Sequence, residues 1–356
     1  MKTTTKTLTT ILCITLIVAC DDLDKFVNPQ QPVTPAPKLE DRSKQAILDY
    51  FDQVVNDGYV VSGQHCGDGP DQTAAFYEDF IETLAVQTGK YVGIVGADFG
   101  YNPSVVYPVN TLVDHWNNGG LITVSWHADN PFVDGYEVRW NSVENKRSID
   151  LLALLKDADD SDARSNYRTE LDNIATTLLK LKEAGVTVIW RPFHEMNGDF
   201  FWWGIDDYSN NQTNEAAYVA LWKDLYETLT VDYGLDNLIW TYAPMSSASW
   251  NADVLAYYPG SDYVDLVGVD YYGTVPDFPD YEELSTLNKT IVMAEAGPAS
   301  ESYGNWNEMD LVDVLKGKAA YFLQWHSWEG ADVAIIDNLN ADTMMNSTTT
   351  ITRDEL

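Results

Sequence analysis

Short apolar runs alternate with amphipathic segments along the chain from about residue 40 onward. The apolar runs are nearly continuous, which is typical of parallel strands that are buried on both faces. They fall at residues 59–62, 91–96, 121–126, 186–190, 237–241, 264–269, 290–294 and 320–324. Apolar residues at helical spacing fall at residues 43–57, 72–88, 104–118, 165–184, 213–233 and 308–316.

Eight strand-like runs separated by helices predict an α/β chain folded as a single (β/α)8 TIM barrel. A doubly wound open sheet is the alternative, although neither a G-x-G-x-x-G nor a P-loop pattern supports a nucleotide-binding version of it. Barrel enzymes build their sites from the C-terminal ends of the strands. Polar or aromatic residues follow nearly every predicted strand, namely His65, Asp98, His127, Glu195, Met245, Tyr271, Tyr272, Glu295 and Trp325.

The charge of the chain narrows the possible ligands. Lys and Arg number 21 against 55 Asp and Glu, giving a formal net charge of −34. Affinity for nucleic acid comes from cationic side chains that displace counterions, so a nucleic-acid partner is disfavoured. Adhesion of the fold itself to an anionic membrane is disfavoured for the same reason. A neutral or cationic ligand fits this composition better.

The N-terminus has the form of a targeting segment. Lys2 and Lys6 precede an apolar run at 11–19 that ends at Cys20. This resembles a bacterial lipoprotein signal, and the acidic residues that follow resemble surface-export signals of Bacteroidetes lipoproteins. We therefore expect a signal peptide at 1–19, an acidic and proline-rich tether at 20–40 after lipidated Cys20, and a folded domain at 41–356. An ordinary secretory signal and a plain membrane anchor are the alternatives.

This reading implies a protein of the cell envelope, attached to the outer membrane only through Cys20 and facing either the periplasm or the exterior. The folded part then holds a single thiol, Cys66, so an internal disulfide is excluded. CxxC and Cys/His zinc patterns are absent, and the five histidines stand at scattered strand ends. The Asp-rich loop at 156–162 lacks the Gly and Glu of a calcium-binding EF-hand. We therefore expect no metal and no cofactor.

The most specific motif runs from Trp190 to Gly204. A predicted strand delivers Arg191, His194 and Glu195 to its C-terminal end, and a loop rich in Phe and Trp follows at once. A carboxylic acid that protonates a glycosidic oxygen needs a raised pKa, and apolar walls around the carboxyl provide it. Aromatic faces also stack against sugar rings. The alternative is a structural ion pair between Glu195 and Arg191.

A second carboxylate ends a buried apolar strand at residues 291–298. Glu295 is followed by small residues, which leave room for a substrate to approach. Glycoside hydrolysis needs two carboxyls that face one bond. By strand order, Glu195 closes barrel strand four and Glu295 closes barrel strand seven. A structural Glu that bonds to barrel backbone is the alternative for Glu295.

With these motifs the sequence resembles glycoside hydrolase family 26, the β-mannanases in particular, over about residues 45–340. The matching parts are the string at 190–204, the strand carrying Glu295, Trp126-His127, and the segment at 268–273. The resemblance implies that Glu195 is the acid/base and that Glu295 is the nucleophile of a retaining double displacement. Phe200 departs from the family, which usually has Trp there, so stacking is kept but an N–H donor is lost.

The resemblance also implies a set of substrate-binding residues. Tyr272 is expected to hydrogen-bond Glu295, His194 to contact the sugar or the nucleophile, and Trp325 to provide an aromatic floor. Asp98 is a candidate for contacts with sugar hydroxyls, and the segment from 130 to 162 is a candidate wall of the site. The full set is His127, His194, Phe200, Trp203, Tyr272, Trp325 and Asp98.

The expected activity is endo-acting hydrolysis of β-1,4-mannosidic linkages in mannan, glucomannan or galactomannan by a monomeric enzyme. Within the same family, specificity for mixed-linkage β-glucan or β-1,3-xylan is an alternative, as is exo-acting release of mannobiose. A glycan-binding lipoprotein without activity is an alternative from another class, but it would be expected to lack one of the two carboxylates. A metallohydrolase barrel would need clustered histidines.

Overall fold

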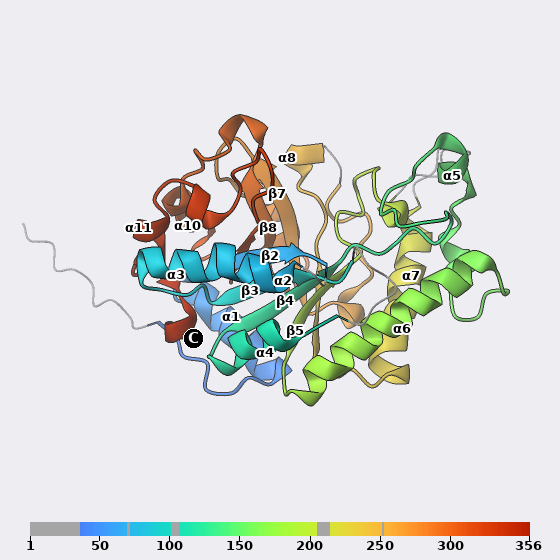
Figure 1. The fold of residues 1–356 in the computed structure, drawn as a ribbon, viewed down its shortest axis with the longest axis horizontal. Coiled ribbons are helices and arrows are strands. Elements are labelled where there is room, and N and C mark those ends of the chain that lie inside the picture. The colour runs from blue at the N-terminus through green and yellow to red at the C-terminus, as the bar shows by residue number, and fades with distance from the viewer. Residues whose placement is uncertain (1–35, 70–71, 101–106, 205–213, 251–252) are drawn as a thin grey trace, which may run out of the picture. The chain divides into compact units, whose positions relative to one another are not determined.

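A closed barrel of eight parallel strands forms the centre of the protein (Figure 1). The computed structural model describes residues 36–69, 72–100, 107–204, 214–250 and 253–356, so the predicted signal peptide, Cys20 and most of the predicted tether lie outside the described residues. Each strand pairs with its neighbours in chain order, and the last closes on the first. The barrel strands are β2 (Gly63–Asp68), β3 (Ile94–Asp98), β4 (Leu121–Trp126), β5 (Val188–Pro192), β6 (Leu238–Tyr242), β7 (Leu266–Gly273), β8 (Thr290–Pro298) and β9 (Phe322–Gln324).

Helices surround this barrel, and the predicted (β/α)8 fold is confirmed. They are α1 (Lys44–Asn56), α2 (Thr73–Phe76), α3 (Thr83–Thr88), α4 (Asn110–Asn117), α5 (Val143–Ser148), α6 (Asp162–Glu183), α7 (Glu215–Glu227), α8 (Ser247–Trp250), α9 (Tyr281–Ser285), α10 (Glu308–Leu315) and α11 (Ala341–Met345). A π-helical segment at Tyr77–Glu82 joins α2 to α3, so the helix predicted at 72–88 is nearly continuous. A second π-helical segment, Thr228–Asp232, extends α7.

The predicted first strand is present in part but does not belong to the barrel. Within residues 59–62, only Val60–Val61 form a strand, β1, and it pairs with β10 (Thr350–Ile351) in a separate two-stranded sheet. The first barrel strand is instead the polar segment that follows, residues 63–68. Its position beside β9 favours a small residue and a side chain that can form hydrogen bonds. A Cβ on Gly63 would stand 2.4 Å from the Phe322 carbonyl oxygen. The Gln64 amide donates to the carbonyls of Gln324 and Trp325, at 3.1 and 3.2 Å, and so closes the seam.

The barrel strands also extend beyond their apolar runs. β8 continues to Pro298, so Glu295 lies within the strand rather than after it. A register shift after Val269 sets Asp270 of β7 opposite Glu295 of β8. The hydrophobic pattern of the sequence does not predict these additional strand residues, because they lie at the polar end of the barrel. This extension places charged side chains inside the mouth of the barrel.

The described core joins the barrel to its helices. The strands β4 and β5 are buried along their whole length. Trp126 of β4 donates its indole N–H to Glu170 of α6 at 2.8 Å. Ala36 and Leu39 pack against the same core, ahead of the domain boundary predicted at 41. In the described ranges, no helix has both the length and the apolar character needed to cross a membrane.

Candidate active site

A pocket of about 540 Å³ opens among the C-terminal ends of the barrel strands. It brings together both predicted catalytic residues and five of the seven predicted binding residues. Its lining is His127, Arg139, His194, Glu195, Phe200, Phe201, Met245, Ser249, Tyr272, Glu295 and Trp325. Asp98 and Trp203 do not line it, and both are fully buried.

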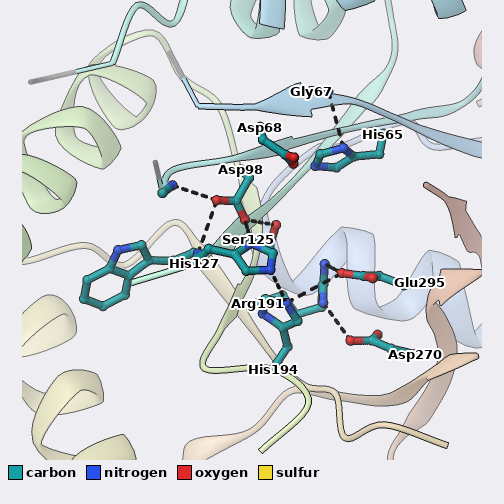
Figure 2. Close-up of polar contacts among 12 residues, drawn as sticks. His65, Gly67, Asp68, Asp98, Ser125, His127, Arg191, His194, Asp270 and Glu295 are labelled. Carbon is teal, nitrogen blue, oxygen red and sulfur yellow. Dashed lines mark hydrogen bonds and ion pairs between the residues drawn. The ribbon is translucent and has the colours of Figure 1, made fainter. Parts of the chain in front are cut away.

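Two neighbouring donors bind the side chain of Glu295, one at each oxygen. The Arg191 guanidinium donates to its Oε1, and the Tyr272 hydroxyl donates to its Oε2 at 2.8 Å. Arg191 also donates to Asp270 at 3.0 Å, so one buried cation joins two buried carboxylates (Figure 2). Burial disfavours the charged guanidinium, but Glu295 and Asp270 outweigh burial and raise the pKa of Arg191. The ion pair considered between Arg191 and Glu195 is therefore wrong: Arg191 serves Glu295 instead.

The surroundings of Glu195 favour its protonated form. Burial raises its pKa to about 8, the charge of Glu295 adds to the shift, and His127, Arg191 and Arg139 oppose it. Its carboxyl is therefore mainly protonated at neutral pH, while its partner across the pocket is held by cationic and hydroxyl donors. A carboxyl that keeps its proton can act as an acid, and a neighbouring carboxyl that is aimed by a guanidinium and a hydroxyl can act as a nucleophile.

The turn that carries Glu195 is strained and strongly supported. Phe193 and Glu195 follow β5 with φ values of 48° and 53°, a region that residues with a side chain rarely adopt. The Trp203 indole donates to the carbonyl oxygen of His194 at 2.7 Å, and the Tyr218 hydroxyl donates to that of Phe193 at 2.9 Å. Trp203 thus holds the turn from behind. The expectation that it stacks on substrate is wrong, because the packing that fixes the turn covers the ring completely.

His127 and His194 lie in a row of side chains between Asp98 and Glu295. Asp98 accepts from Nδ1 of His127 at 2.7 Å, and Nε2 of His127 lies 3.2 Å from Nε2 of His194. Burial lowers the pKa of His127, but Asp98 outweighs burial and the net shift is upward. Burial and the Arg191 charge hold the pKa of His194 well below its usual value, so the His194 ring is neutral. His194 Nε2 lies 3.8 Å from Oε1 of Glu295.

Asp98 is therefore a positioning residue rather than a sugar ligand. Its carboxylate also accepts from the Ser125 hydroxyl at 2.5 Å and from the Gly100 N–H at 2.7 Å. These bonds use its oxygens within the barrel, and its side chain has no exposed surface. The expectation that Asp98 contacts sugar hydroxyls is therefore wrong.

The walls of the pocket are aromatic, as expected. Trp325 stacks on His65 with ring centroids 3.6 Å apart, and Phe200 packs edge-on against Phe201 at 4.6 Å. The segment 130–162 does reach the site: Arg139 lines the pocket and forms a backbone bridge with Phe201. Arg139 carried no signal in the sequence, because a charged loop residue is placed by tertiary structure alone.

Sequence reasoning also missed the connecting role of Asp270 and the pairing of Arg191 with Glu295. Only the register shift in β7 shows that Asp270 and Glu295 share one guanidinium. The histidines were wrongly expected to be scattered. Four of the five meet at the mouth of the barrel, because strands distant in sequence close on one another; they are His65, His127, His194 and His326.

Two groups of described residues have the composition of metal ligands. His194, Asp270 and Glu295 form one, but Arg191 already binds both carboxylates, so a cation there would meet a guanidinium. His65, Asp68 and His326 form the other, outside the catalytic pair. Neither is required for the chemistry of two opposed carboxyls.

A TIM barrel whose C-terminal pocket places two glutamates between aromatic walls, one with a raised pKa and one bound by a guanidinium, has the architecture of a glycoside hydrolase. Comparison with known proteins identifies the family. The model of glycosyl hydrolase family 26 matches residues 33–355, and the chain belongs to that family.

Several relatives and solved structures support this assignment. The chain is 34% identical to the mannan endo-1,4-beta-mannosidase A and B of Caldalkalibacillus mannanilyticus, a match that covers 75% of the chain and only 52% of that relative. It is 30% identical to a mannan endo-1,4-beta-mannosidase of Bacillus subtilis strain 168, over 84% of each protein. The structure of the Bacillus subtilis mannanase BCman superposes with a TM-score of 0.74 at 26% identity, over 90% of this chain and 95% of that one.

Proposed function

We propose that the protein is an endo-acting β-1,4-mannanase that hydrolyses mannan, glucomannan or galactomannan with retention of anomeric configuration. The observation that carries the proposal is a pair of glutamates in one aromatic-walled pocket: Glu195 has a raised pKa, and Glu295 is bound by Arg191. The names of the family relatives support β-1,4-mannan as the substrate.

In the first step a Glu295 oxygen attacks the anomeric carbon, and the bond from that carbon to the glycosidic oxygen breaks. Glu195 gives its proton to the departing oxygen, so the shortened chain leaves as an alcohol. The anomeric carbon is now bonded to Glu295 as a glycosyl ester. Arg191 and Tyr272 aim the attacking carboxylate, because each holds one of its oxygens.

In the second step Glu195 acts as a base. Its raised pKa owes part of its shift to the charge of Glu295, and that charge disappears when the ester forms. The pKa of Glu195 therefore falls in the intermediate, and its carboxylate can take a proton from water while the water oxygen attacks the anomeric carbon. The ester bond breaks, Glu295 leaves as a carboxylate, and two inversions give net retention.

The substrate and the stereochemistry can be tested together with the unaltered protein. Mannan, glucomannan, mixed-linkage β-glucan and β-1,3-xylan should be digested side by side and their products separated. We expect mannan and glucomannan to yield a ladder of short oligosaccharides, and proton NMR of early products from mannopentaose to show the β-anomer first. Faster digestion of β-glucan or β-1,3-xylan, or mannobiose as the sole early product, would contradict the endo-mannanase assignment.

Removal of the acid should separate the two substrate types. Glu195→Ala should slow mannan hydrolysis on the order of 10²–10⁴-fold, whereas formation of the intermediate from an aryl mannoside with an acidic phenol should be spared. Azide should then restore turnover and give a β-glycosyl azide. The native enzyme should lose kcat/KM on mannan as pH rises through about 8, because the acid must be protonated, and that alkaline limb should vanish in the variant on the aryl substrate.

The matched control is Glu301→Ala, which removes an exposed carboxylate six residues after Glu295. Its rates and pH profile should equal those of the native enzyme. Equal losses on mannan and on the aryl mannoside in a folded Glu195→Ala protein, with no azide product, would rule out the acid/base role.

We also propose that the protein is an envelope lipoprotein anchored through Cys20. The support is the sequence alone: basic residues, a short apolar run and Ala19-Cys20. The mature acyl groups would then be the membrane contact, and the pocket would act on soluble polysaccharide near the membrane surface.

Substitution of the acylated residue tests the anchor. Cys20→Ala should move the protein from the membrane fraction to the soluble fraction, because several acyl chains together provide the attachment. Cys13→Ala alters the same segment without touching the acceptor, and should leave the distribution unchanged. A Cys20→Ala protein that stays with the membrane and is released only by detergent would contradict lipidation.

A further inference from the structure

Three residues beside the pocket take no part in the proposed chemistry. His65 lies in β2, Asp68 ends that strand, and His326 follows β9. The seam between β2 and β9, where Gln64 pairs with Gln324, brings these distant segments together. One potential ligand atom from each residue lies within 4.8 Å of those from the other two. Figure 2 shows Asp68 beside the His65 ring.

The hydrogen bonds of this cluster leave two acceptors facing each other. Nδ1 of His65 accepts from the Gly67 N–H at 3.3 Å and lies 2.8 Å from Nδ1 of His326. Because His65 Nδ1 accepts, His326 Nδ1 is the donor, and Nε2 of His326 carries a lone pair. That nitrogen lies 3.6 Å from Oδ2 of Asp68, which is an acceptor as well when the carboxyl is ionised.

Further polar atoms of the cluster are buried without a partner. Among the described residues, neither Oδ1 of Asp68 nor Nε2 of His65 has a hydrogen-bond partner. The His65 side chain is fully buried, and His326 is 4% exposed. Unpaired buried polar atoms are costly, and a cation that accepts the lone pairs of Asp68 and of His326 Nε2 relieves part of that cost. The Asp68 side chain is 23% exposed, which leaves a route from solvent.

The donor set indicates the kind of cation. Two imidazoles and one carboxylate suit borderline transition metals, with remaining positions left for water. Zinc–nitrogen distances of about 2.0–2.1 Å place neighbouring ligand atoms about 3.3 Å apart, close to the present separation of His326 and Asp68. We propose that His65, Asp68 and His326 form a binding site for one divalent transition-metal ion of the zinc or cobalt type. The expectation of no metal rested on the scattering of histidines, which the barrel seam removes.

Such an ion would affect the pocket through the ring of His65. His65 stacks face to face on Trp325, with an interplanar angle of 11°, and Trp325 lines the pocket. A metal bond to His65 would fix the ring on which Trp325 rests. The metal site does not depend on which sugar the enzyme cleaves, so it stands or fails separately from the proposed function.

Cobalt binding tests the site without reference to activity. The protein, purified without a polyhistidine tag, is stripped with a chelator, freed of it, and titrated with Co²⁺ by calorimetry and visible absorption. We expect saturable one-to-one binding, with a dissociation constant at least tenfold weaker in Asp68→Asn and in His326→Asn. Asp277→Asn, which removes an exposed carboxylate elsewhere on the chain, should bind like the native protein.

A second measurement guards against unfolding of the variants. Zn²⁺ in excess should raise the Tm of the native protein and of Asp277→Asn but not that of Asp68→Asn. Circular dichroism establishes that each variant is folded, and if His326→Asn is not, Asp68→Asn alone decides. Absence of one-to-one cobalt binding by the native protein, or equal affinity in folded Asp68→Asn, would overturn the proposal.

Discussion

One buried guanidinium holds the active centre together. Arg191 lies inside the barrel with almost no exposed surface and binds Asp270 and Glu295 at once. Because a buried charge is tolerated only when it is paired, each of these three residues requires the others. Removal of one partner from such a set typically costs about 3–5 kcal/mol. The ion pairs of Arg191 thus fix the position of Glu295 and also allow charged side chains to be buried inside the barrel.

The remaining features of the site follow from this arrangement. The Glu295 charge adds to the burial that raises the pKa of Glu195, so the nucleophile helps to keep the proton on the acid. Glu195 stands on a turn with positive φ that residues outside the pocket hold in position. Backbone strain of this kind persists only where surrounding structure compensates for it. Here the compensation comes from Trp203, whose indole N–H satisfies the carbonyl oxygen of His194.

The sequence predicted the barrel well because its strands are apolar on both faces and its helices are amphipathic. It failed at the barrel seam, where β2 is polar and Gln64 takes the place of a hydrophobic residue. Both carboxylates could be found because each follows an apolar run within a distinctive string of residues. Asp270 and Arg139 could not be assigned, because a register shift and a loop position determine their roles. Trp203 and Asp98 were recognised as important residues, but burial makes them supports instead of sugar ligands.

The central claim is that Glu295, held by Arg191 and Tyr272, forms the covalent bond to the sugar. A 2-deoxy-2-fluoro mannosyl fluoride tests it most directly, because the fluorine slows hydrolysis of the glycosyl ester and allows the intermediate to accumulate. Peptide mapping of the inactivated protein should place one fluoromannosyl mass on Glu295. The same mass on Asp270, on Glu195 or on any other carboxylate would contradict the account.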